Sequence, residues 1–311
     1  MSGIAAVMKD AGADPLWQLL PCDTRPGDHQ PGARTRQYGL ERSGRILYRF
    51  NAAGYRGEDY DPEAAFRFCV IGESESFGIG IDEHLAWPRR LADHLAAALR
   101  LAPEDVNVVN LSVGDASADY ITRTLIRQVP GLVFDLVICH FPPPHRMEFF
   151  DGSRFRQFTR AGIAHRPPDW LSGPERGFRA LQNDHMARLG YLRNLLLAQA
   201  LLEGARQPYL LATEHLEADA EPNPALRPLL AALDPRWILC HRLFQARHDL
   251  AVDGRHAGPA THGALAVAML DLIADQLDRR GREDEVEAIR AYAEAARDAD
   301  ADWLAVAAGA D

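Results

Sequence analysis

Cysteine is scarce in this chain, and its spacing excludes a disulfide framework and the usual zinc motifs. The four cysteines lie far apart and form no Cys-x-x-Cys pair: Cys22, Cys69, Cys139 and Cys240. We expect reduced, buried thiols. Cys139-His140 and Cys240-His241 could together offer soft ligands to zinc. Neighbouring residues on a strand point to opposite faces, however, which argues against that arrangement.

Long apolar runs and an excess of positive charge are also lacking. No window approaches the ~20 consecutive apolar residues of a membrane-spanning helix, and residues 1–20 lack the pattern of a signal peptide. We therefore expect a cytoplasmic protein that does not enter a membrane. Acidic side chains outnumber basic ones by 44 to 34, and the resulting net charge of −10 repels a phosphate backbone. Nucleic acid is not an expected partner.

The composition is that of a soluble globular protein. The 311 residues are 47% hydrophobic and 25% charged, which excludes wholesale disorder, a fibrous repeat and a coiled coil. We find no internal repeat and no break in composition near the middle. The sequence therefore predicts one α/β domain over residues 65–280, a loop-rich N-terminal extension over 1–64 that packs on the core, and a C-terminal helical extension over 281–311.

Apolar runs that alternate with helical periodicity predict the fold class. Strands are expected at 66–71, 106–111, 134–141, 208–213 and 236–239, with a shorter one within 45–50. Helices are expected at 85–101, 119–128, 175–204 and 261–277, with one or two more near the C-terminus. The strands are almost continuously apolar, so helices should cover both faces of the sheet. The prediction is a three-layer α/β/α fold with a flavodoxin-like parallel sheet of about five strands.

Two candidate site segments directly follow predicted strands, where ligands bind in such sheets. Residues 72–80 read Gly-Glu-Ser-Glu-Ser-Phe-Gly-Ile-Gly. Ser74 would lie at a helix N-terminus, where free N–H groups stabilise negative charge, but a plain N-cap serine fits as well. The segment lacks Gly-Lys-Ser/Thr, which excludes a Walker phosphate loop. Residues 110–115, Asn-Leu-Ser-Val-Gly-Asp, could expose the N–H of Gly114 to the same crevice or form an ordinary turn.

A third candidate segment lies late in the chain. Asp253 precedes His256 by three residues, so its carboxylate can fix the tautomer of the imidazole while the other ring nitrogen faces a nucleophile. His262 follows at the start of a predicted helix, where a packing role is expected. A structural histidine is compatible with the same spacing, so this pair alone is weak evidence for catalysis.

Taken together and in this order, the segments resemble the SGNH hydrolase superfamily, also called GDSL esterases and lipases. The resemblance covers about residues 50–275, and its motifs are 48–57, 72–80 with Trp87-Pro88, 110–114, and 253–256 with His262 and the following helix. It implies the SGNH hydrolase fold. It also implies that Ser74 is the nucleophile, that His256 is the general base and that Asp253 orients His256. The N–H groups of Ser74 and Gly114 would then bind the oxyanion.

Two departures from the family pattern matter. The aspartate of the first block is Glu73 here, which leaves the nucleophile unchanged. The third block, where the family has Gly-x-Asn-Asp and the asparagine donates to the oxyanion, reads Phe-Pro-Pro-Pro-His-Arg at 141–146. Losing one such donor typically costs ~100–1000-fold in turnover. Either His145, Arg146 or another group replaces it, or the site is slow or specialised.

Arg146 has two interpretations of equal weight. It is either a salt-bridged loop residue or a group that binds the oxyanion or a substrate carboxylate, and in the second case it would favour acidic acyl groups.

The resulting expectation is serine-dependent hydrolysis of an ester or related acyl substrate through an acyl-enzyme. The resemblance implies no metal and no organic cofactor, and the expected partner is a small-molecule acyl substrate. Two alternatives stay open: an acyltransferase that uses the same triad, and a catalytically reduced binding protein. The sequence indicates neither the substrate nor the oligomeric state.

Overall fold

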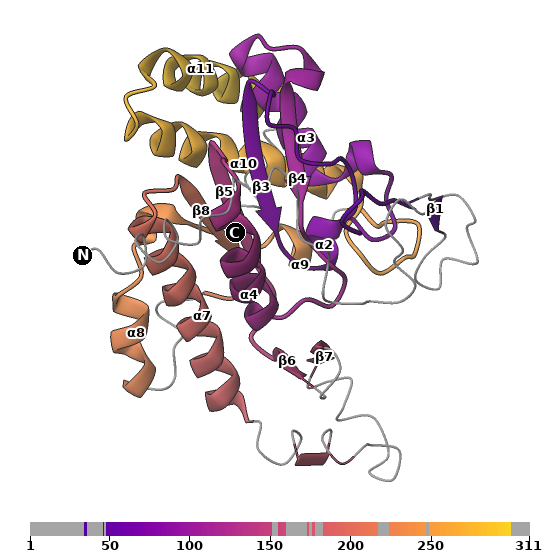
Figure 1. The fold of residues 1–311 in the computed structure, drawn as a ribbon, viewed down its shortest axis with the longest axis vertical. Helices are drawn as coiled ribbons and strands as arrows, with labels where there is room; N and C mark the ends of the chain where they lie inside the picture. The colour runs from indigo at the N-terminus through magenta and orange to yellow at the C-terminus, as the bar shows by residue number, and fades with distance from the viewer. Residues whose placement is uncertain are drawn as a thin grey trace.

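A five-stranded parallel sheet forms the centre of the molecule (Figure 1). The computed structural model describes residues 34–35, 46, 48–150, 155–159, 173, 176–177, 183–216, 224–246 and 249–299. The strands are β3 Phe66–Ile71, β4 Val106–Asn110, β5 Leu136–Phe141, β8 Tyr209–Thr213 and β9 Ile238–Cys240. Their order is β4-β3-β5-β8-β9, in which the first two strands are exchanged relative to the chain. This is the flavodoxin-like order, so the predicted fold class is confirmed.

Helices cover both faces of the sheet. On one face lie α3 Trp87–Leu99, α10 Pro259–Asp278 and α11 Glu283–Ala299; on the other lie α4 Ala118–Gln128 and α7 Asp184–Gly204. Figure 1 shows α10 beside α11 and α4 beside α7, and these pairs are in contact. The shorter helices are α2 Ser74–Phe77, α8 Arg227–Ala231 and α9 Leu243–Ala246. Single 3-10 turns occur at Glu83–Leu85, Pro103–Asp105, Val129–Gly131, Pro224–Leu226 and Pro235–Trp237.

The central strand β3 explains why two helical layers form. Its side chains alternate between the faces, so Phe68 and Val70 pack against the α3 and α10 layer, whereas Cys69 and Ile71 pack against the α4 and α7 layer. All four are fully buried. A strand that is apolar on both sides can be buried only between two amphipathic layers, which is the physical reason for the three-layer arrangement.

Four features differ from the predicted elements or were not expected. An antiparallel hairpin, β6 Arg146–Phe150 and β7 Phe155–Thr159, occupies a stretch for which the sequence analysis predicted no strand. Helix α7 begins at residue 184 rather than 175, because the side chain of Asn183 caps it by accepting from the N–H of Met186. The fifth sheet strand begins at 238 rather than 236. The N-terminal strand β2, Tyr48–Arg49, pairs with β1, Arg34–Thr35.

The predicted extensions are described in part. Most of residues 1–47, including Cys22, lie outside the described residues. The described residues 48–64 are mostly buried, and α11 packs on α10 and α3. Within the described part of the chain, no helix combines the length and the apolar character needed to cross a bilayer.

Candidate active site

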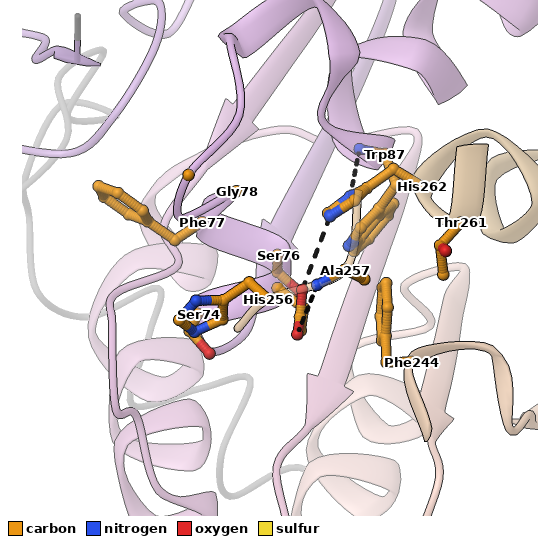
Figure 2. A network of polar contacts seen from close by, with 12 residues as sticks. Ser74, Ser76, Phe77, Gly78, Trp87, Phe244, His256, Ala257, Thr261 and His262 are labelled. Carbon is orange, nitrogen blue, oxygen red and sulfur yellow. Dashed lines mark hydrogen bonds and ion pairs between the residues drawn. The ribbon is translucent and has the colours of Figure 1, made fainter. Parts of the chain in front are cut away.

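One pocket of about 1250 Å³ lies at the carboxyl ends of the parallel strands. Its lining includes Ser74, Arg146, Asp253 and His256, so four of the predicted site residues meet there although the sequence separates them by up to 182 positions. Gly114 is buried in the turn directly before Asp115, which lines the pocket. Figure 2 shows Ser74 and His256 close to α2. The predicted segments 72–80 and 253–256 therefore line the same pocket.

Ser74 is the first residue of the short helix α2, which follows β3 through Gly72 and Glu73. A side chain at position 72 would place its Cβ only 2.3 Å from Ser76 Oγ, so the turn requires glycine there. Glu73 caps the helix, since its Oε1 accepts from the N–H of Glu75 at 3.0 Å. The hydroxyl of Ser74 donates to Glu73 Oε2 at 2.5 Å. Ser74 is thus buried and held at the base of the pocket.

Asp253 and His256 form the side-chain pair that their spacing predicts. Asp253 Oδ2 lies 2.6 Å from His256 Nδ1, while Asp253 Oδ1 accepts from the backbone N–H groups of Arg255 and His256. Burial acts to raise the pKa of Asp253, but the hydrogen bonds from His256 outweigh it and hold the pKa below its ordinary value. The carboxylate is therefore ionised and fixes the imidazole proton on Nδ1, which leaves Nε2 as the basic nitrogen.

Glu73 forms a buried ion pair with Arg146. Arg146 Nη1 donates to Glu73 Oε2 at 2.6 Å, and the same oxygen accepts from Ser74. Burial would raise the pKa of Glu73, but the charge of Arg146 and the hydrogen bonds lower it to about 2. The charge of Arg146 is thus matched inside the protein, which weakens the expectation that it selects acidic acyl groups.

The two residues considered as replacements for the family's asparagine have different positions. Arg146 lines the pocket, whereas His145 is exposed and is not among the residues that line it. The extra methylene of Glu73 relative to aspartate lets its carboxylate reach both the neighbouring serine and this arginine.

Arg56 anchors the opposite end of α2. It is almost completely buried and donates to the carbonyls of Phe77, Gly78 and Ile81 at 2.6 to 2.8 Å. Its guanidinium lies over the ring of Tyr48, 4.6 Å from the centroid. Burial lowers the pKa of Arg56 to about 10, so the side chain remains charged at neutral pH. The segment 48–57 therefore fixes the helix that carries Ser74.

A chain of polar groups leads from the pocket into the protein, and two of its members, His140 and Glu214, line the pocket. Ser76 Oγ is 2.8 Å from His140 Nδ1, and His140 Nε2 is 3.3 Å from His241 Nε2. His241 Nδ1 is 3.5 Å from Glu214 Oε1, which also accepts from the N–H of Phe244. Ser76 is therefore fully buried and paired with a histidine other than His256.

The zinc alternative has the wrong geometry. His140 and His241 do stack, with centroids 5.3 Å apart, but Cys139 is buried in the core on the α4 and α7 side, as strand alternation predicts. Cys240 is exposed and donates to the carbonyl of Leu216. In the described ranges, no group of three or more His, Cys, Asp or Glu side chains could hold a metal ion.

Sequence reasoning missed several pocket residues. His140 lies near the end of β5, and Glu214 and His215 directly follow β8. The rule that ligands bind at the carboxyl ends of the strands would have found them, because strand 208–213 was predicted. Glu75 lies between two serines, Ser74 and Ser76, and nothing in its sequence position distinguishes it from an ordinary helix carboxylate.

Lowering the pH from about 7 to 5 is expected to destabilise the protein strongly. Burial lowers the pKa of His140, His241 and His262 to about 3 each. In the unfolded chain they titrate near 6.5, so the unfolded state binds up to three more protons below that pH. The contribution of these neutral rings to the unfolding free energy is fully present above about pH 7. It is lost as the pH falls towards 3, by up to about 4 kcal/mol per pH unit.

Thermal unfolding between pH 8 and 5 measures this effect. A steep fall of Tm is expected, with a slope reduced by about one proton in His262→Phe. A Tm that stays level over this range would contradict the assignment of neutral, buried rings.

No protein-family model matches the chain, and no curated protein does. Solved structures do. TesA shares 14% identity over 68% of this chain and 99% of its own, with a TM-score of 0.42. The esterase EstA from Pseudoalteromonas shares 12% over 68% and 98%, with a TM-score of 0.42. The lipase/acylhydrolase from Enterococcus faecalis shares 16% over 69% and 96%, with a TM-score of 0.37.

At these identities and TM-scores the similarities carry no argument about the family or the reaction of this chain.

Proposed function

We propose that the protein is a serine-dependent hydrolase that cleaves an ester or related acyl substrate through an acyl-enzyme. The observation that carries the proposal is the meeting of Ser74 with the Asp253–His256 pair in one pocket. A nucleophile, a base and a carboxylate that orients the base are the groups that acyl transfer to a serine requires.

The reaction begins when Ser74 Oγ attacks the acyl carbon and His256 Nε2 takes its proton. In the resting structure the hydroxyl donates to Glu73 instead, so a rotation about the Cα–Cβ bond of Ser74 must precede the attack. The imidazolium then protonates the leaving alcohol, and the carboxylate of Asp253 stabilises its charge. Water, deprotonated by His256, attacks the acyl-enzyme and releases the acid.

The oxyanion is proposed to be bound by the N–H groups of Ser74 and Gly114 and by Arg146. Arg146 is favoured over His145 because it lines the pocket and contacts the carboxylate that holds Ser74. One nitrogen of its guanidinium is paired with Glu73, and the planar fork has further N–H groups to offer.

Acyl transfer to an alcohol uses the same steps up to the acyl-enzyme. The volume of about 1250 Å³ exceeds that of a typical small-molecule pocket and leaves room for an acceptor beside the acyl group. We propose hydrolysis as the activity, and the products formed in the presence of alcohols distinguish it from transfer.

Short neutral p-nitrophenyl esters are expected to be hydrolysed, with an initial burst of p-nitrophenol from acylation. An ester with an acidic acyl group is expected to react more slowly, because Glu73 already matches the charge of Arg146 and Glu75 and Asp253 line the same pocket. Arg146→Ala is expected to lose about 100-fold in kcat if it donates to the oxyanion.

Arg146→Lys is the control, because it keeps a cation beside Glu73, and Tm is followed in each variant. If neither ester is hydrolysed, the protein is interpreted as a binding protein instead of an enzyme. Rapid hydrolysis of the neutral ester that Arg146→Ala does not change would retain the enzyme and discard the role of this arginine.

A further inference from the structure

The loop that carries the proposed base is tied at both ends to the segment that carries the proposed nucleophile. Before the base, the N–H of Val252 donates to the carbonyl of Gly80 at 3.1 Å. After it, the N–H of Ala257 donates to Glu75 Oε1 at 3.5 Å. Glu75 directly follows Ser74 in α2 and is one of the residues that line the pocket. The first tie joins backbone to backbone, whereas the second depends on one side chain.

The second oxygen of Glu75 faces a buried histidine. His262 Nε2 lies 3.6 Å from Glu75 Oε2. On the other side of the ring, Nδ1 accepts from the N–H of Trp87 at 3.1 Å, a contact that Figure 2 shows as a dashed line. Because Nδ1 accepts, the neutral ring carries its proton on Nε2, which faces the carboxylate at a distance too long for a hydrogen bond. His262 and Trp87 are both fully buried, at 0% exposure. The histidine is therefore held at the start of α10 by the hydrogen bond that it accepts from the first residue of α3.

A carboxylate suits both neighbours. Its Oε1 accepts from the N–H of Ala257, and its Oε2 faces the positive edge of the His262 ring without forming a hydrogen bond. A glutamine side chain of the same shape has one acceptor and one donor. It would turn an NH₂ group towards one of the two N–H groups whichever way it lay.

We propose that Glu75 is a positioning residue. By accepting from the amide of Ala257, it holds the neighbouring ring of His256 in position beside Ser74. The inference rests on the proposed function, which gives the contact its catalytic consequence. The loop has no comparable side-chain tie to α2 among the described contacts. A misplacement of about 1 Å between reacting groups can cost about 100-fold in rate.

Glu75→Gln is expected to slow both ester turnover and the labelling of Ser74 by a fluorophosphonate. The expected loss is about 10–100-fold in kcat and in the labelling rate constant, with KM changed less than about 3-fold. A purely structural role would reduce the amount of protein that reacts, whereas the rate constant of the folded fraction would stay the same. The split between kcat and KM therefore separates the two roles.

Asp135→Asn is the matched control. Asp135 also accepts from a backbone N–H, that of Arg67 at 2.8 Å, and pairs with Arg282, but it precedes β5 at the opposite end of the sheet. The Asp135→Asn variant loses the same charge and a comparable contact as Glu75→Gln. Its Tm should therefore fall, while its labelling rate constant stays at the wild-type value.

Equal labelling rate constants in wild type and Glu75→Gln, with the wild type labelled on Ser74, would overturn the positioning role and leave the proposed function intact. A wild type that is not labelled at all would overturn the proposed function, and the positioning role with it. If Glu75→Gln does not fold, Glu75→Asp replaces it. Its shorter carboxylate cannot reach both neighbours, so the same loss of rate is expected and an unchanged rate counts against the proposal.

Discussion

Ser74→Ala is expected to lower kcat/KM for a neutral activated ester by at least about 1000-fold, because no other group in the proposed mechanism can form the acyl-enzyme. The hydroxyl of Ser74 is at the pocket, next to the ion pair of Glu73 and Arg146. Steady-state kinetics with a p-nitrophenyl ester measures the loss. The circular dichroism spectrum and Tm of the variant should match those of the wild type closely.

Ser76→Ala is the natural control, because this second serine is only two residues away. Its hydroxyl is buried and contacts His140, so its removal costs stability rather than the nucleophile. The loss of that contact is expected to cost about 1–3 kcal/mol of unfolding free energy. Turnover should remain within about 10-fold of the wild type. The assignment of Ser74 would be wrong if Ser76→Ala lost activity to the same extent and Ser74→Ala retained it.

His256→Ala is expected to cost at least about 1000-fold in kcat, because the serine then lacks its base. The 2.6 Å contact with Asp253 fixes the tautomer that this role needs. Asp253→Asn should therefore also lose activity, by up to about 10,000-fold, because an amide can hold the wrong tautomer. The pH dependence of kcat/KM reports whether a single basic group must be deprotonated.

Substitution of His262 is expected to affect turnover much less than substitution of His256. It is fully buried, accepts from Trp87 and faces Glu75 rather than the pocket. His262→Gln should accordingly lower Tm and cost far less turnover than His256→Ala, about 10–100-fold through Glu75. Equal losses in two folded variants would contradict the division of roles between the two histidines.

The fold could be predicted from the sequence because its strands are short apolar runs, two of which, β3 and β5, are followed directly by glycine or proline. The strand 66–71 is observed with the predicted bounds, and the others differ by one or two residues. The pairing of Asp253 with His256 could also be predicted, since three residues along a turn bring the side chains together. Neither result required long-range information.

The contacts among the buried polar groups of the pocket could not be predicted, because the partners are distant in the chain. Glu75 meets Ala257 across 182 positions, and His140 meets His241 across 101. Local periodicity carries no information about which buried histidine faces which carboxylate. The hairpin 146–159 was missed for another reason: its residues are polar and aromatic, and it lies outside the sheet that the apolar runs indicate.

The most direct test of a serine nucleophile at position 74 is mass mapping of the adduct formed with a fluorophosphonate. A single modified site is expected, on Ser74, in both wild type and Ser76→Ala. No adduct is expected in Ser74→Ala, and slow formation is expected in His256→Ala, where the base is missing. An adduct on another residue, or an unmodified wild-type protein that is folded and has its pocket open, would contradict the central claim.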